Sequence, residues 1–561
     1  MVQGIYFGQH KTVIQLFPKD IQIDLPEEFT NPFRYHPHPL VITAAKATIE
    51  KIKESDLHTS FSEGKMIGIL IVRDSSDNIG YLCGYSGNVG GRNDIEGFVP
   101  PIYDLLDPDG YFKKGEQELN ELNSHIRAIE FSPEITSLKQ LIYRCRADME
   151  NEISSMKLDI AEAKAKRKTI RKEATDPVIL EELTKESQFQ KAQLHRLKTE
   201  WKDKIQKLES RLLYIEDEIR QMKRLRAEKS EELQKWIFRQ YIVTNSEGQT
   251  VSISEIFESE GLIPPGGTGE CAAPKLLNYA FTHELHPLAM GEFWYGKSPE
   301  TAVRTHGHFY PSCTSKCGPL LKFMIQGLKI SGLFNDGDYH KQPVIIYEDS
   351  HIIGISKPSG MPSVPGLDGK ESALEWINHK YSSRLHAVHR LDMDTSGVIV
   401  FTKDEKTAID LRKQFEEHSI KKTYRARLDH IQESQIADQK TFRKGETGEI
   451  VLPLSPDYDE RPRQKIDHTR GKTSITEYRI IDIMPDGSID IEFYPITGRT
   501  HQLRVHAAHI LGLGHPIMGD MLYGGSSSSR LHLHARSITF THPGTGMQVF
   551  IETDINSWYD A

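Results

Sequence analysis

Residues 389–397 decide the fold of the C-terminal part of the chain. They read HRLDMDTSG and run directly into residues 398–401, a β-branched apolar segment that is typical of a buried strand. Asp392 therefore lies in a polar loop, close to Arg390 and just before the core. A carboxylate that leaves water needs a charged partner and hydrogen bonds, or it takes up a proton. This arrangement predicts a functional carboxylate at Asp392.

The same run resembles the catalytic loop of the RluA-type RNA pseudouridine synthases, which reads HRLDxxTSG. Other stretches are similar to further motifs of that family, namely residues 347–366, 422–424, 497–506, 514–520 and 533–535. The resemblance covers residues 340–561 and no part of residues 1–335. It implies a pseudouridine-synthase fold, in which a bent mixed or antiparallel sheet with flanking helices surrounds a central cleft.

The resemblance also implies a reaction. Enzymes of this family break the C1′–N1 glycosidic bond of a uridine in RNA, rotate the uracil and rejoin it through C5. The resemblance implies no cofactor and no metal, because one carboxylate supplies covalent catalysis. Asp392 carries over as that carboxylate, and Arg504 as the salt-bridge partner that keeps it ionised. Tyr424 carries over as a ring that stacks on the target base or takes part in proton transfer.

Local patterns place these residues on secondary structure. The apolar residues of 503–511 follow a helical spacing that ends at a glycine, so we expect Arg504 on a helix. Residues 423–428 alternate as a short strand with Tyr424 on its apolar face. Residues 475–494 predict two strands joined by a turn.

We expect RNA to bind through basic and histidine side chains of the same motifs. Arg390 would stack in the space that a flipped uridine leaves and contact phosphate. The other expected RNA contacts are His389, Lys357, Lys422, Arg425, Arg499 and His501. The expected substrate is a stem-loop of ribosomal or transfer RNA, with a ribosomal subunit as a further candidate partner.

Two other functions fit part of the pattern. A non-catalytic RNA-binding or ribosome-assembly factor would use the same scaffold without the chemistry. A glycoside hydrolase would use Asp392 and Asp394, but two carboxylates at i and i+2 in one loop rarely reach the opposed ~5–9.5 Å geometry that hydrolysis requires. Isomerisation of uridine is therefore the leading hypothesis.

The composition is globular. Of 561 residues, 37% are apolar and 27% are charged, and this length predicts three or four domains. The net charge of −9 disfavours nonspecific binding to RNA. RNA affinity depends on local phosphate contacts, however, and basic residues cluster in 421–427 and 461–472. No run is long enough to cross a membrane, and an odd number of cysteines, five, favours a reducing compartment. We expect a cytoplasmic protein with no membrane partner.

The N-terminal part predicts further domains, so that the whole chain is expected to be an α+β multidomain protein. Residues 1–130 indicate an α/β or mainly β region with a hairpin in 66–85. Residues 134–236 carry apolar residues at steps of three and four between charged flanks, interrupted at Pro177. This pattern predicts an inserted antiparallel coiled-coil hairpin with arms ~60 Å long.

Residues 237–335 form a separate region that contains cysteines and histidines. Cys271 comes where a glycine-rich loop enters a predicted helix, and His308, Cys313 and Cys317 follow. Three soft ligands and a histidine match the donor set of a zinc site, and the layout faintly resembles zinc-dependent nucleoside deaminases. The cysteine spacing and the missing glutamate depart from those enzymes. We therefore predict buried, unliganded cysteines and no metal, with structural zinc and a deaminase-like site as the alternatives.

Overall fold

The structure is a computed structural model. It describes residues 13–17, 23–173, 175–331, 342–366, 370–381, 384–430, 441–458, 460–526 and 528–553. The chain divides into two compact units: Leu105–Ile237 forms one, and the segments before and after it together form the other.

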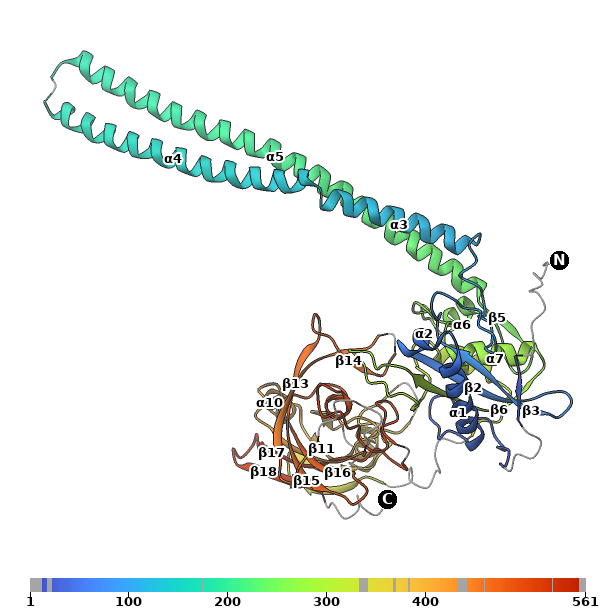
Figure 1. The fold of residues 1–561 in the computed structure, drawn as a ribbon. Helices are drawn as coiled ribbons and strands as arrows, with labels where there is room; N and C mark the ends of the chain where they lie inside the picture. The colour runs from blue at the N-terminus through green and yellow to red at the C-terminus, as the bar shows by residue number, and fades with distance from the viewer. Residues whose placement is uncertain are drawn as a thin grey trace. The chain divides into compact units, whose positions relative to one another are not determined.

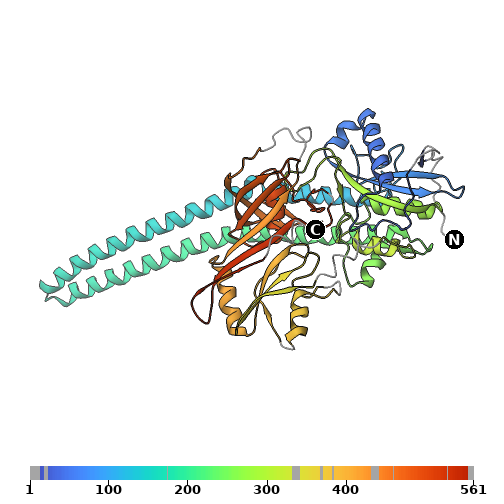
Figure 2. The same cartoon turned by 90° about the horizontal axis from the view of Figure 1, so that it is seen from below.

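The unit Leu105–Ile237 is a helical arm. Helices α3 (Tyr111–Glu130) and α4 (Pro133–Glu173) follow one another along α5 (Pro177–Gln240), as Figures 1 and 2 show. Asp176 accepts a hydrogen bond from the Val178 N–H and so caps α5. The ion pairs that join the two sides in antiparallel order are Arg167–Glu186, Arg146–Glu209, Glu134–Arg211 and Glu118–Lys229.

The arm is longer than the predicted hairpin. It includes Tyr111–Glu130, which the sequence pattern assigned to the N-terminal α/β region. Helix α3 ends at Glu130. The rings of Tyr111 and Trp236 contact each other at a tilt, with their centroids 4.5 Å apart, so α3 still packs along α5. The 64 residues of α5 span about 96 Å at 1.5 Å per residue, rather than the expected ~60 Å.

The first part of the other unit is a five-stranded antiparallel sheet. Its strands lie in the order β1 (Gln15–Leu16), β3 (Ile79–Tyr85), β2 (Lys65–Arg73), β6 (His286–Tyr295) and β7 (Phe309–Tyr310). The predicted hairpin is the pair β2–β3. Helices α1 (Pro39–Glu54) and α7 (Ala272–Thr282) pack on this sheet. The smaller elements are α2 (His58–Ser62), β4 (Ile242–Thr244), β5 (Thr250–Ser252), α6 (Ile253–Ser259) and α8 (Gly318–Met324).

This sheet corrects the predicted division of the N-terminal part. Strand β6 pairs with β2 from Lys65↔Tyr295 to Arg73↔His286, so the regions before and after the arm share one sheet. The predicted regions 1–130 and 237–335 are therefore halves of a single module, which we call the sheet module (described residues of 13–104 and 238–331). Local sequence patterns could not show this pairing, because the two strands are far apart in the chain.

The C-terminal part holds a mixed sheet of eleven strands. The order is β14 (Gln464–Ile466), β13 (Thr447–Pro456), β15 (Lys472–Ile483), β16 (Ile489–Pro495), β12 (Lys421–Leu428), β17 (Leu533–Thr541), β11 (Ser396–Thr402), β9 (Ile352–Lys357) and β8 (Val344–Glu348). Strand β10 (His386–Ala387) pairs with β11, and β18 (Gln548–Glu552) pairs with β17. The expected strand pair in 475–494 is β15–β16, and the pairs are antiparallel except β11–β17.

Strand β11 follows the loop of residues 389–395 and places it at the centre of the domain. All seven of its residues are buried. Val398 and Val400 pack with α10 (Glu405–Glu416) on one face, and Ile399 and Phe401 pack with α9 (Ala373–Tyr381) on the other. Residues 389–395 therefore enter a strand that is fixed on both faces.

None of the helices in the described residues is both long and apolar enough to span a membrane.

We predict that Gly397→Ala destabilises the protein. Gly397 has φ +112°, and a Cβ there would lie 2.2 Å from the Ala535 carbonyl oxygen on β17. The left-handed backbone and the backbone clash together should cost about 2–4 kcal/mol in the free energy of unfolding. Thermal denaturation measures this cost. Gly318→Ala, where the nearest atom would be 3.9 Å away, is the matched control and should melt like the wild type.

Candidate active site

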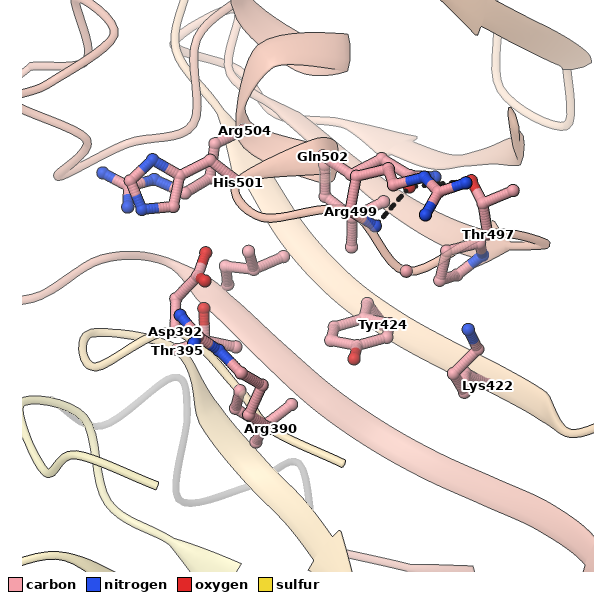
Figure 3. A pocket seen from close by; sticks show the side chains of 15 residues that line it. Arg390, Asp392, Thr395, Lys422, Tyr424, Thr497, Arg499, His501, Gln502 and Arg504 are labelled. Atoms are coloured by element: carbon pink, nitrogen blue, oxygen red, sulfur yellow. Dashed lines mark hydrogen bonds between the residues drawn. The ribbon is translucent and has the colours of Figure 1, made fainter. Parts of the chain in front are cut away.

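A polar pocket lies where the loop before β11 faces β12 and α11 (Gln502–Ala508). Its lining includes Arg390, Asp392, Thr395, Lys422, Tyr424, Thr497, Arg499, His501, Gln502 and Arg504. Figure 3 shows Asp392, Tyr424 and Lys422 along one side and Arg504, His501 and Arg499 along the other. The pocket thus brings together the three residues predicted to carry the chemistry.

Asp392 is half-buried at the end of the pocket. Burial raises the pKa of its carboxyl, whereas Arg504, Arg390, Lys357 and a hydrogen bond from the His501 backbone N–H lower it; the net shift is upward. The carboxylate is therefore held by charges from several segments rather than by one partner.

The segment after β9 fixes the loop that carries Asp392. The Ser363 hydroxyl donates to the Leu391 carbonyl at 2.8 Å and accepts from the Leu391 N–H at 3.0 Å. The Ser359 hydroxyl donates to the Asp394 carbonyl at 2.6 Å. The first motif of the resemblance is therefore a support for the catalytic loop.

Lys357 belongs to the same support, which corrects its predicted contact with RNA. Its side chain is buried, and its ammonium donates to the carbonyls of Pro358, Met361 and Met393 at 3.0, 2.7 and 2.9 Å. Burial lowers the pKa of Lys357 to about 7, although Asp394 and Asp392 raise it. A lysine enclosed by three carbonyls cannot also reach an RNA phosphate.

Arg504 lies on α11, as predicted, but its ion pair differs from the expectation. The guanidinium makes two 2.7 Å bonds to Asp520, and 4% of the residue is exposed. Burial lowers the pKa of Arg504, but Asp520, Asp392 and Tyr523 together raise it, so the net shift is upward. The charge of Arg504 lowers the pKa of Asp392, but the ion pair of Arg504 is with Asp520. Helix α11 also ends at Ala508, earlier than the predicted 511.

Asp520 is the partner of Arg504, and the sequence reasoning missed it. It follows Gly519 in the last part of the family resemblance, but nothing in that short motif indicated its partner. Its carboxylate is fully buried, and it also accepts from the Tyr523 N–H at 3.3 Å. A buried carboxylate needs such partners.

Tyr424 is half-buried on β12 and lines the pocket. The pairing of β12 with β17 shifts between Thr423 and Tyr424, and an irregularity of this kind re-aims a side chain. Burial, and then the negative charge of Asp392, raises the pKa of Tyr424. The phenol therefore stays protonated and offers an aromatic face with a hydrogen-bond donor.

Two more of the predicted RNA contacts are structural. The Nε2 atom of His389 accepts from the Val400 N–H at 3.0 Å, and its ring stacks on Phe415; burial lowers its pKa to about 3. Arg425 is buried and pairs with Asp490 at 3.2 Å and Glu492 at 3.6 Å. Both predictions of RNA contact are wrong because these side chains face partners that are distant in the sequence.

The remaining predicted contacts do line the pocket. Arg390 and Arg499 are exposed, and Lys422 is half-buried with a pKa that burial lowers to about 8. His501 is buried, and its backbone is left-handed at φ 52°. Its Nδ1 atom lies 2.9 Å from the Tyr523 hydroxyl. Burial lowers the pKa of His501 to about 3, so it is a neutral group.

The four candidate zinc ligands do not all lie together. The side chains of Cys271, Cys313 and Cys317 contact one another, with Cys271 at the start of α7 and Cys317 at the start of α8. His308 is turned away, its ring 4.8 Å from the Tyr310 ring, and burial lowers its pKa to about 4. Within the described ranges, no group of three or more His, Cys, Asp or Glu could hold a metal ion. We assign no metal site to these residues.

Comparison with known proteins finds relatives of the C-terminal part of the chain. The family described as RNA pseudouridylate synthase matches residues 351–509. The dual-specificity RNA pseudouridine synthase RluA of Yersinia pestis is 40% identical over 220 residues, which is 38% of this chain and 99% of that protein. The enzyme of the same name from Escherichia coli K12 is 40% identical over 210 residues, or 36% of this chain and 89% of that protein. A solved human protein, RNA pseudouridylate synthase domain containing 4, is 23% identical with a TM-score of 0.29, covering 38% of this chain and 88% of that one. Since nearly the whole of the Yersinia pestis enzyme is matched at this identity, the chain belongs to the RluA-type family of RNA pseudouridine synthases.

Proposed function

We propose that Asp392 is the carboxylate with which this chain isomerises uridine to pseudouridine in structured RNA. The observation that carries the proposal is the meeting of Asp392, Tyr424 and Arg504 in one pocket beside exposed cations. A non-catalytic factor would not need a carboxylate that several positive groups hold against protonation.

The geometry supports a reaction without a cofactor. Asp392 attacks C1′ or removes the proton at C2′ as the N1–C1′ bond breaks. The uracil rotates while Tyr424 stacks on its face, and a C5–C1′ bond forms. If Asp392 attacked C1′, C5 displaces its carboxylate in this step; if Asp392 removed the C2′ proton, it returns that proton to C2′. The hydrogen on C5 is lost and one is gained at N1, so the atoms balance and the product is an isomer of the substrate.

The proposed substrate is a stem-loop of ribosomal or transfer RNA, free or within a ribosomal subunit. A paired uridine must leave its stack to reach Asp392, which costs a few kcal/mol. Arg390 and Arg499 at the pocket can contact the phosphates around the flipped base. All five cysteines are free, which supports a reducing, cytoplasmic location.

Asp392→Asn should abolish the modification. The amide keeps the size of the side chain but cannot act as nucleophile or base, so the rate should fall by about 10³-fold or more. Mapping of pseudouridine in total RNA from cells that carry only this variant measures the effect and names the substrate uridine. Asp410→Asn, on the exposed face of α10, is the matched control. Full modification by Asp392→Asn would refute the proposal.

Activity should fall on the acidic side at a higher pH than for an ordinary aspartate. The reaction needs the carboxylate, so activity is lost as pH falls through the pKa of Asp392, which lies above 3.8. Arg390→Gln removes a positive charge that lowers this pKa, and the midpoint should move to still higher pH. Single-turnover rates with saturating RNA, measured against pH, test the shift. A midpoint that moves to lower pH would contradict it.

Tyr424 variants separate stacking from proton transfer. Tyr424→Phe keeps the aromatic face, whereas Tyr424→Ala removes it and should weaken RNA binding by about 1–3 kcal/mol. The loss is measured as the equilibrium affinity for RNA of Tyr424 variants that also carry Asp392→Asn, which prevents turnover. If the hydroxyl moves a proton, Tyr424→Phe lowers kcat without the loss of binding. Equal binding by the Phe and Ala variants would rule out stacking.

A further inference from the structure

The sheet module lies outside the family match, which begins at residue 351, but it contacts the catalytic domain within the same compact unit. One contact joins Arg34 of the module to Asp394 in the loop of Asp392, with 3.5 Å between the guanidinium and the carboxylate. Further contacts come from residues 298–314, which we call the module loop. They reach residues 460–466, which we call the supporting segment, and the end of α11. Since α11 carries Arg504, these contacts lead toward the pocket.

Arg304 is the central side chain of the module loop. Only 4% of its side chain is exposed, and its guanidinium pairs with Glu460. It also lies 4.7 Å from the centre of the Tyr310 ring, on which Arg463 packs at 5.1 Å. A buried arginine with a carboxylate partner and an aromatic neighbour holds one orientation.

Backbone groups hold the supporting segment at both ends. The Ile466 N–H donates to the Thr301 carbonyl at 2.9 Å. The hydroxyl of Thr314 donates to the Arg461 carbonyl at 2.8 Å, and the Thr314 N–H donates to the same oxygen at 3.2 Å. These bonds leave the supporting segment little freedom to shift.

The supporting segment is in turn linked to Asp392 through Tyr523 and His501. The Gln464 N–H donates to the Tyr523 hydroxyl oxygen at 2.7 Å. That hydroxyl lies 2.9 Å from Nδ1 of His501, and the His501 backbone N–H donates to the Asp392 carboxylate. Each step from the module loop to Asp392 is thus a direct contact.

At the end of α11 there is a second, shorter connection. The Glu300 carbonyl lies 3.1 Å from Nε2 of His509, the residue that caps this helix. His509 itself is buried, and the contact is partly buried. The module loop therefore supports the helix of Arg504 as well as the residue beside Asp392.

We propose that the module loop, through Arg304, is a positioning element of the active site that holds Tyr523 and His501 in place at Asp392. This inference rests on the proposed function of Asp392. Arg304 does not line the pocket and is buried, so it acts through other residues and not on the RNA. A small displacement of a reacting group lowers the rate of a reaction while leaving most binding contacts intact.

The test uses the full chain and steady-state kinetics on the RNA that the modification mapping identifies. Arg304→Ala should lower kcat by roughly tenfold, with KM for RNA changed by less than about twofold. Arg304→Lys keeps the charge opposite Glu460 and should recover part of the loss, although it loses the planar contact with Tyr310. Glu460→Gln, on the other side of the ion pair, should lower kcat in the same direction.

Lys275→Met is the matched control. Lys275 is also a buried cation of the sheet module, and its ammonium donates to the Tyr85 and Gly87 carbonyls, within the module itself. This variant should lower the melting temperature but leave kcat unchanged at temperatures where the protein is folded. An equal loss of kcat in Lys275→Met would show that general destabilisation is the cause and would overturn the inference.

Two other outcomes would also overturn it. An unchanged kcat in Arg304→Ala and Glu460→Gln would show that the module loop does not position the site. A rise in KM alone would show that the loop contacts RNA instead. If the Asp392→Asn enzyme kept full activity, the proposed function would fail, and this result is distinguishable because it does not depend on Arg304.

Discussion

Burial of the Asp392 carboxyl favours its protonated form, and the positive groups around it oppose this effect by favouring the ionised form. Arg504 supplies positive charge but is itself buried, so it needs the two bonds to Asp520. Removing one partner of such a buried pair leaves an uncompensated charge, which costs about 3–5 kcal/mol. Asp520 is therefore needed to keep the Arg504 charge buried near Asp392, although Asp520 does not line the pocket.

Burial also disfavours the charged form of Lys357, whose pKa it lowers. Three carbonyl oxygens accept hydrogen bonds from the ammonium and keep it in place. One of these carbonyls belongs to Met393, next to Asp392, so the lysine holds the catalytic loop and adds positive charge near it. A lysine held in this way is not exposed to a ligand, whereas Arg390 and Arg499 at the pocket are exposed cations.

Local patterns predicted the parts of the fold whose signal is local. The strand after the catalytic loop, the β15–β16 hairpin and the helical arm all follow from the spacing of apolar residues. The side chains of Lys357, His389 and Arg425 were assigned to RNA because their charge is visible in the sequence and their partners are not. Arg425 lies on the polar face of its strand as predicted, but that face is covered by Asp490. The β2–β6 pairing was missed for the same reason.

The two sides of the pocket depend on different parts of the chain. Arg504 is held by Asp520, which lies within the catalytic domain. His501 is held by Tyr523, and Tyr523 is bonded to a segment that the sheet module contacts. His501 contributes a backbone N–H and a neutral ring, so a change in the module would alter its position and not the net charge around Asp392. The positive charges around Asp392 thus come from Arg504, Arg390 and Lys357 of the family's shared domain, whereas His501 is also linked, through Tyr523 and Gln464, to a segment that the sheet module contacts.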